Sequence, residues 1–198
     1  MTNLTRRAAL FAVLAGFSPP VRAQDLAEAG PFIQRAGNEL AELIAGQPSL
    51  PERRRRILPF LERVVDVDAV ARFCLGRYWA TATPQQQAEY LAQFRLVLAN
   101  GVAGRLGEYR GDRIRVVTGR PDSREGGIHV PTTVERPGNR PNSVVWIVVP
   151  SGNTFRIIDV VAEGISLRLT QRSDYAAYLG RNGGDVGALI RAMHAQLS

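Results

Sequence analysis

The sequence predicts an α+β fold, in which an antiparallel sheet is segregated from helices that cover it. Apolar residues follow helical spacing from Leu26 to about Tyr109 and again beyond Ile165, whereas between these segments the period falls to two. The 198 residues are 45% hydrophobic and 22% charged, a composition that suits one globular core. Neither an internal repeat nor a low-complexity segment interrupts the chain.

The first 23 residues predict a cleaved export signal. Arg6-Arg7 precedes the uncharged stretch Ala8 to Phe17, and Pro19-Pro20 and the cleavage site Val21-Arg22-Ala23 follow. The apolar stretch is about half the roughly 20 residues that a membrane-spanning helix needs. We therefore expect cleavage after Ala23 and a single soluble periplasmic domain over residues 24–198. The arginine pair is compatible with twin-arginine (Tat) export, but Ala9 replaces the bulky residue usual in that signal, so general secretion (Sec) stays open.

Charge and cysteine content exclude several classes of protein. The 25 basic residues are all arginine, and removing the leader leaves 22 arginines against 18 acids, a net charge of +4. These arginines are scattered and not grouped with aromatic residues, which argues against a nucleic-acid surface. Cys74 is the single cysteine, so the chain has neither a disulfide framework nor a cysteine for lipid attachment after the leader.

Six helices are expected in order along the chain. Asp66 can cap the third of them, while Thr83, Pro84 and Gln86 form the start signal known as a capping box. The longest helix follows this box, and its predicted apolar stripe is Leu91, Phe94, Leu98, Val102 and Leu106, flanked by Gly101 and Gly104. The expected helices are Leu26–Ile44, Pro51–Val65, Asp66–Leu75, Thr83 to about Tyr109, Ile165–Leu179 and Val186–Leu197.

Strands are expected between the longest helix and the last two. Ile114 and Val116 open the first, and apolar residues alternate from Ile128 to Val134 in the second. Val144–Val149 is a continuous apolar run, which predicts a central strand covered on both faces. A turn over residues 150–153 then leads into Phe155–Val161 and completes an antiparallel meander.

The search for catalytic chemistry yields one pair of acids and no metal site. His129 and His194 lack further ligands at usable spacing, so no metal or cofactor is expected. Asp159 lies within an apolar run, and with Glu163 it leaves open a periplasmic hydrolase. The structural alternative pairs a buried Asp159 with Arg77 or Arg72, and places Glu163 at the N-terminus of the next helix.

One basic run leaves a docking function open. Arg53 to Arg56 fills a full helical turn, so its side chains spread around the helix and cannot form one face. Such a run is usually solvated surface, and the functional alternative is docking to anionic headgroups or to an acidic partner.

Four blocks of residues, taken together and in order, resemble the MlaC family. They are Asp68–Trp79, which includes Leu-Gly-Arg-Tyr-Trp, then Thr83–Phe94, Asp159–Leu167, which includes Glu-Gly-Ile-Ser-Leu, and Arg172–Tyr175. The similarity runs from about Phe32 to Leu197. The chain departs from the family where it has Phe155 for tryptophan, Ile158 for an aromatic residue and Tyr175 for phenylalanine.

The resemblance implies a non-enzymatic phospholipid carrier with a curved antiparallel sheet similar to nuclear transport factor 2, with extra helices. Members of the family are also known as toluene-tolerance auxiliary components. They carry phospholipid between an outer-membrane lipoprotein–porin complex and an inner-membrane ABC transporter with its substrate-binding component. This transport maintains outer-membrane lipid asymmetry. A hopanoid-associated branch and an adaptor that carries no lipid stay open as alternatives. We place the expected acyl-chain pocket between the concave face of the sheet and the longest helix. Its expected lining is Tyr78, Phe94, Leu98, Val102, Val130, Val145, Ile147, Phe155 and Ile165. Both faces of the Val144–Val149 strand are apolar, so the sequence does not fix whether Val145 and Ile147 or their neighbours face the pocket.

Overall fold

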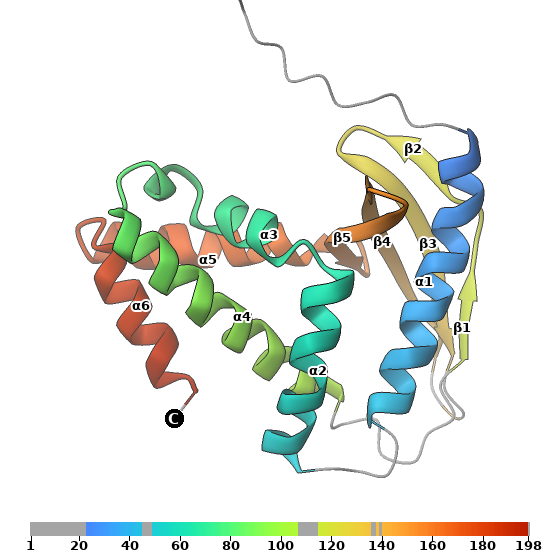
Figure 1. The fold of residues 1–198 in the computed structure, drawn as a ribbon, viewed down its shortest axis with the longest axis horizontal. Helices are drawn as coiled ribbons and strands as arrows, with labels where there is room; N and C mark the ends of the chain where they lie inside the picture. The colour runs from blue at the N-terminus through green and yellow to red at the C-terminus, as the bar shows by residue number, and fades with distance from the viewer. Residues whose placement is uncertain (1–22, 45–48, 107–114, 136–137, 139, 198) are drawn as a thin grey trace, which may run out of the picture.

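The computed structural model describes residues 23–44, 49–106, 115–135, 138 and 140–197. It confirms the predicted α+β fold: a curved antiparallel sheet lies beside a group of helices, with α2 between them (Figure 1). The predicted leader lies outside the described residues apart from Ala23, at which the first helix begins.

The helices that follow Asp66 and Thr83 begin where these capping signals place them. The Asp66 carboxylate accepts a hydrogen bond from the Ala69 amide, and Thr83 and Gln86 exchange the two bonds of a capping box at 3.0 and 3.2 Å. The helices are α1 (Ala23–Ile44), α2 (Leu50–Val64), α3 (Val67–Leu75), the 3₁₀ turn η1 (Gly76–Trp79), α4 (Pro84–Leu106), α5 (Leu167–Arg181) and α6 (Val186–Ala195).

The sheet is antiparallel throughout, in the order β1-β3-β4-β5-β6, with β2 pairing with the same edge of β3 as β1. The Ile165–Ser166 segment forms the short strand β6, so α5 begins two residues later than the sequence predicts. The predicted strand at Val144–Val149 is the central β4, but only Ile147 and Val148 of that run are buried. The strands are β1 (Arg115–Thr118), β2 (Asp122–Arg124), β3 (Gly127–Glu135), β4 (Asn142–Ser151), β5 (Thr154–Ala162) and β6 (Ile165–Ser166).

A β-bulge in β5 decides which face Asp159 occupies. Ile157 pairs with Val148 and Asp159 pairs with Ile147, so Ile158 is the extra residue between the two pairs. Directly paired residues share a face of the sheet, and adjacent residues of β4 point to opposite faces. The bulge therefore places the Asp159 carboxylate on the face opposite to the Ile157 side chain.

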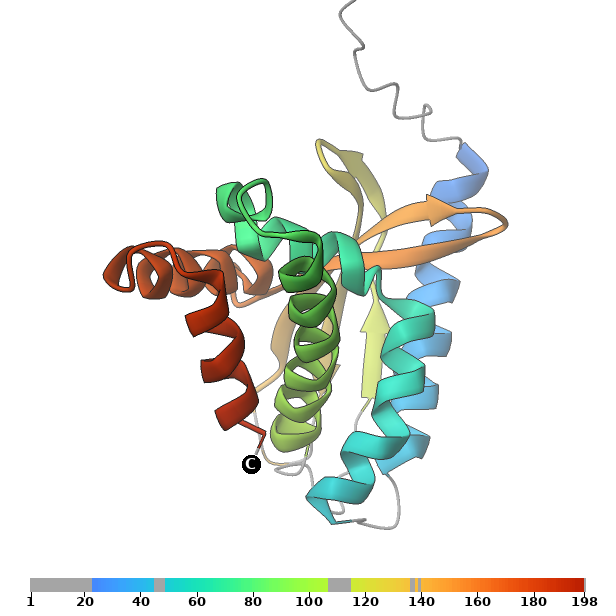
Figure 2. The ribbon, with the colours of Figure 1, turned by 60° about the vertical axis from the view of Figure 1, so that its left-hand side comes forward.

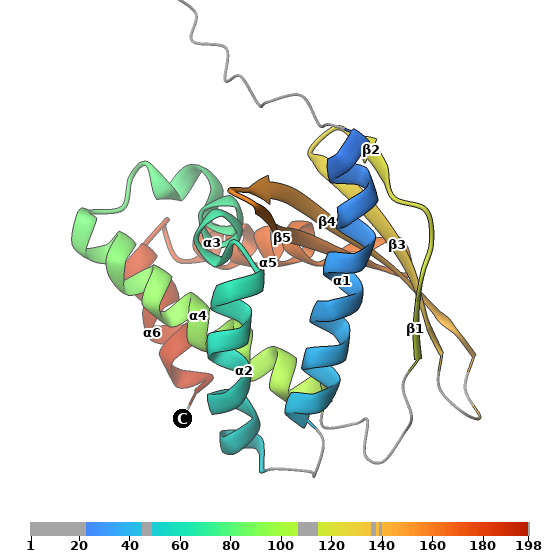
Figure 3. The same cartoon turned by 45° about the vertical axis from the view of Figure 1, so that its right-hand side comes forward.

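The core consists of two clusters that meet along α4. The sheet cluster packs α1, α2 and the end of α4 against Ile128, Val130, Val148, Phe155 and Ile157. The helical cluster joins α3, α5, α6 and the start of α4 around Tyr90 and Phe94. Figure 2 shows α4 between α2 and α6, and Figure 3 shows α1 lying along the sheet.

This division corrects the predicted stripe of the longest helix. The fully covered side chains of α4 are Tyr90, Phe94, Ala99 and Ala103, whereas Leu98 and Val102 are half-buried. Gly101 and Gly104 are exposed, and no atom of the described chain lies within 4 Å of the position of a side chain there. The helix turns different faces to the two clusters, which a single stripe cannot describe.

Candidate functional site

One face of the sheet carries an apolar strip that the helices leave partly uncovered. The side chains of Val130, Trp146 and Val160 lie in one row across β3, β4 and β5, and Val144, Ala162 and Ile165 lie in the next row. Val130 is fully buried, but the other five range from half-buried to exposed, and Ile165 is 61% exposed. We call these five residues the open strip: Val144, Trp146, Val160, Ala162 and Ile165.

The open strip continues the sheet cluster and forms its unsealed border. Trp146 and Val160 pack against that cluster, as do Leu98 and Val102 from α4. The Trp146 indole nitrogen donates a hydrogen bond to the Thr132 hydroxyl at 3.0 Å, and that hydroxyl in turn donates to the Val144 carbonyl. The polar atoms beneath the strip are thereby satisfied, so the surface that it offers a ligand is apolar.

The structure brings together five of the nine expected pocket residues. Val130 and Phe155 are in the sheet cluster, Leu98 and Val102 border it, and Ile165 shares its face of the sheet. Tyr78 and Phe94 belong instead to the helical cluster, where Phe94 lies 5.9 Å from Tyr90, ring centroid to ring centroid.

The prediction of which β4 side chains face the pocket is wrong. Val145 and Ile147 point to the opposite face from Val130, because Val130 pairs with Trp146. The residues that the sequence analysis missed are therefore Val144, Trp146, Val160 and Ala162. Both alternations of β4 are apolar, so only the register with β3 identifies them.

Asp159 is buried as expected, with its side chain 2% exposed, and it organises the start of α5. One carboxylate oxygen accepts hydrogen bonds from the Val160 and Arg168 amides at 2.8 and 3.1 Å. The other accepts the Ser166 hydroxyl at 2.6 Å and lies 3.3 Å from Nε of Arg168. Ser166 also caps α5 by accepting the Leu169 amide. The carboxylate thus stabilises a helix N-terminus and a buried ion pair.

The expected partners of Asp159 and Glu163 are wrong. Arg77 donates a hydrogen bond to the Tyr78 hydroxyl and lies over that ring, and Arg72 lies over Trp79, so Arg168 takes the role assigned to them. Glu163 accepts from the Ser143 amide at 2.8 Å and does not cap α5. The two acids therefore serve separate structural contacts.

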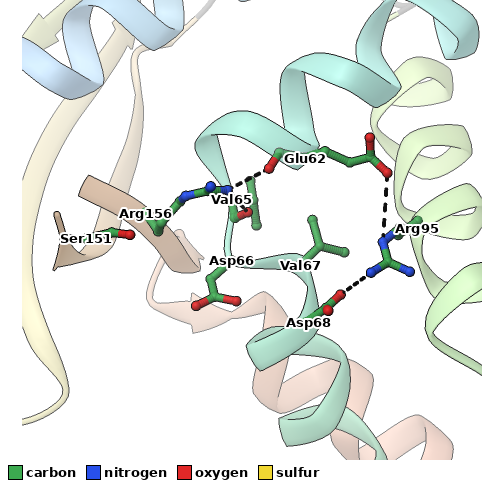
Figure 4. A pocket seen from close by; sticks show the side chains of 8 residues that line it. All are labelled: Glu62, Val65, Asp66, Val67, Asp68, Arg95, Ser151 and Arg156. Carbon is green, nitrogen blue, oxygen red and sulfur yellow. Dashed lines mark hydrogen bonds and ion pairs between the residues drawn. The ribbon is translucent and has the colours of Figure 1, made fainter. Parts of the chain in front are cut away.

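A polar cleft of about 400 Å³ lies where α2, α3 and α4 meet the β4–β5 hairpin (Figure 4). Arg95 crosses it between Asp68, at 2.5 Å, and Glu62, at 3.8 Å, while Arg156 donates to the main-chain carbonyls of Glu62 and Val65. The cationic groups that line the cleft are thus engaged by carboxylates and carbonyls. The cleft is separate in its lining from the open strip.

Other chemistry in the described part of the chain is limited. The 23–44, 49–106, 115–135 and 140–197 segments hold no group of three potential metal-ligating side chains. None of their helices has the combined length and apolarity needed to cross a bilayer. Cys74 is buried, and burial together with the nearby Asp159 charge raises the pKa of its thiol to about 12.

A curved antiparallel sheet with one partly uncovered apolar face and a helical cover defines this chain as an α+β protein with the architecture of a binding domain. The chain belongs to the MlaC family, since the family model described as MlaC protein matches residues 34–195. The family resemblance is therefore confirmed. A similar solved structure is described as the phospholipid-binding protein from Ralstonia solanacearum in complex with a phospholipid. It has a TM-score of 0.71 and 24% identity, and the match covers 85% of this chain and 98% of that chain.

Proposed function

We propose that this protein is a non-enzymatic phospholipid carrier whose open strip receives the acyl chains. Family membership supports a role in lipid binding and transport, and the similar Ralstonia protein was solved with a phospholipid. The observation that carries the proposal is the open strip, where apolar side chains border the core without being sealed into it.

The physical need for a carrier follows from the cost of exposing lipid to water. Two acyl chains of roughly 15 methylenes each, at about 0.8 kcal/mol per methylene, would cost on the order of 25 kcal/mol. An apolar surface at the border of the sheet cluster, which Leu98 and Val102 of α4 also border, would hold such chains away from water. Both carboxylate oxygens of Asp159 are engaged, by the Val160 amide within β5 and by groups at the start of α5, which favours binding over hydrolysis.

We place this carrier in the periplasm, between an outer-membrane lipoprotein–porin complex and an inner-membrane ABC transporter. The leader over residues 1–23 and the family resemblance support this placement.

Mass spectrometry of organic extracts from the purified mature protein tests the function. Stoichiometric phospholipid would support the carrier. Hopanoid in its place would favour the hopanoid-associated branch, and protein without lipid after mild purification would favour an adaptor.

A matched pair of substitutions tests the location of the chains. Val160 and Val161 are adjacent and both half-buried, but Val160 borders the sheet cluster whereas Val161 points to the other face. Because a charge in a dry site costs several kcal/mol, Val160→Glu and Leu98→Glu should lose bound lipid while Val161→Glu retains it. Thermal melting of each variant checks folding. A well-folded Val160→Glu or Leu98→Glu protein that keeps its full complement of lipid would contradict the location.

A further inference from the structure

Exposed apolar side chains concentrate at the junction of β6 and α5. Ile165, Leu167 and Leu169 are 61%, 36% and 57% exposed, and the only other large hydrophobic residues exposed in the described chain are Leu50 and Val117. The three fall within five consecutive residues, beside the end of the open strip to which Ile165 belongs. We call them the apolar tip. An exposed apolar group of this kind marks a surface that meets another apolar phase.

Four arginines lie on α3, η1 and α5, which pack together (Figures 1 and 3). They extend from Arg168, next to the apolar tip, toward the far end of α5, where the Tyr78 ring contacts Gly184. Arg168 and Arg172 lie over the Phe73 ring at 4.5 and 4.8 Å from its centroid, measured from the guanidinium carbon. Arg72 lies over Trp79 at 5.2 Å and Arg77 over Tyr78 at 4.9 Å. The Arg172 guanidinium also approaches Gly76, so it joins α5 to η1. We call Arg72, Arg77, Arg168 and Arg172 the arginine corner.

The charge of this corner is largely uncompensated. Asp159 lies 3.3 Å from Arg168, but within the part of the chain that the structure describes no carboxylate comes within 4 Å of a nitrogen of Arg72, Arg77 or Arg172. Stacking on an aromatic ring fixes a guanidinium while leaving its N–H edge free to donate. The corner therefore presents fixed cations that match an anionic partner.

We propose that the arginine corner and the apolar tip dock this protein on an anionic lipid bilayer. Leu169 enters the headgroup region and the arginines contact lipid phosphates, which is the combination found in interfacial membrane-binding segments. The proposal rests on the proposed carrier function and deepens it by naming the partner surface. A bilayer is favoured over an acidic protein because the tip adjoins the open strip, so docking there brings the acyl-chain site next to the source of its ligand.

The other basic segment of the chain does not form such a surface. Arg53 is buried and donates to the Ala103 carbonyl, and Arg56 pairs with Glu52. Arg53 and Arg56 thus point in different directions, as the sequence predicts for a run that fills a full helical turn. Arg54 and Arg55 of this run provide a control with the same number of charges.

Flotation of the purified mature protein with vesicles tests the proposal. The wild-type protein should float with phosphatidylcholine vesicles that contain phosphatidylglycerol, and far less with phosphatidylcholine alone. Leu169→Glu should weaken this binding at least about tenfold, since it replaces an inserted apolar side chain with an anion. Leu169 is in the first turn of α5, where a glutamate suits the helix, so folding should be preserved. Leu50→Glu is the matched control, because Leu50 is 41% exposed in the first turn of α2.

The charge contribution has its own pair of variants. Arg72→Gln with Arg77→Gln should weaken binding by about fivefold for each arginine, whereas Arg54→Gln with Arg55→Gln should change it much less. Leu169→Gln, which adds no charge, should also weaken binding if Leu169→Glu proves unstable.

Three results would overturn the docking proposal. One is a wild-type protein that does not float with anionic vesicles. The second is equal loss in the variant and control of either pair, and the third is capture by an acidic protein partner without vesicle binding. The lipid content of each preparation is measured separately. A Leu169→Glu protein that retains lipid but does not float supports docking. Lipid-free wild-type protein contradicts the carrier function, and the flotation result then tests the docking surface alone.

Discussion

Replacing Asp159 with asparagine should destabilise the protein substantially, because the carboxylate is a buried junction between β5 and α5. An asparagine that keeps its oxygen toward the Val160 and Arg168 amides would turn its NH₂ group toward Nε of Arg168. Removing one partner of a buried pair costs about 3–5 kcal/mol. The Arg168 side chain is partly exposed, which lowers the expected cost to about 2–3 kcal/mol. For a domain of this size that corresponds to a decrease of about 4–12 °C in melting temperature.

Thermal and urea unfolding, followed by circular dichroism, measure the effect. Asp174→Asn on the exposed side of α5 is the matched control and should stay within about 0.5 kcal/mol of wild type. Combining Asp159→Asn with Ser166→Ala should cost less than the sum of the two single changes, because both side chains act in one network. An Asp159→Asn protein with the wild-type melting temperature would refute this reasoning, and one that also loses a hydrolytic activity would make the catalytic alternative correct.

Two further predictions concern the helical half of the molecule. The pKa of Cys74, raised to about 12, keeps its thiol neutral in the folded protein, so an aromatic disulfide reagent at pH 8 should label it only after unfolding in denaturant. The same raised pKa should lower stability as the pH rises from about 9, where the unfolded thiol ionises, toward 12, and Cys74→Ala should reduce that loss in urea titrations. Thr83→Ala removes half of the capping box of α4 and should cost about 1 kcal/mol in the same titrations, whereas Thr81→Ala, outside the box, should cost less.

Local signals in the sequence predict the helices well because their causes are local. Asp66 and Thr83 cap helices through bonds to residues three positions away, and the structure contains both caps. The switch from helical to alternating spacing likewise locates the sheet, although the short strands β2 and β6 have too few residues to show a period.

The site depends on long-range pairing that the sequence does not encode locally. The Gly152-Asn153 turn sets Ser151 opposite Thr154, and an uninterrupted ladder from there would pair Asp159 with Trp146. The bulge at Ile158 shifts the register by one, so Trp146 pairs with Val160 and Asp159 moves to the other face. The choice of Arg77 as partner fails for a related reason: Arg168 reaches Asp159 only because β6 and Ser166 return the chain to β5.

The bulge also links the two proposed surfaces. By turning Asp159 away from the apolar face, it allows Val160 and Ala162 to continue the open strip while the carboxylate fixes Ser166 and the first turn of α5. That fixed turn carries Leu167 and Leu169, and the strand leading into it carries Ile165. The single extra residue of the bulge therefore puts charged and apolar side chains on opposite faces of β5. The Asp159–Arg168 ion pair, which would be costly beside acyl chains, is buried on one face. The other face stays apolar as far as Ile165, where the chain reaches the surface.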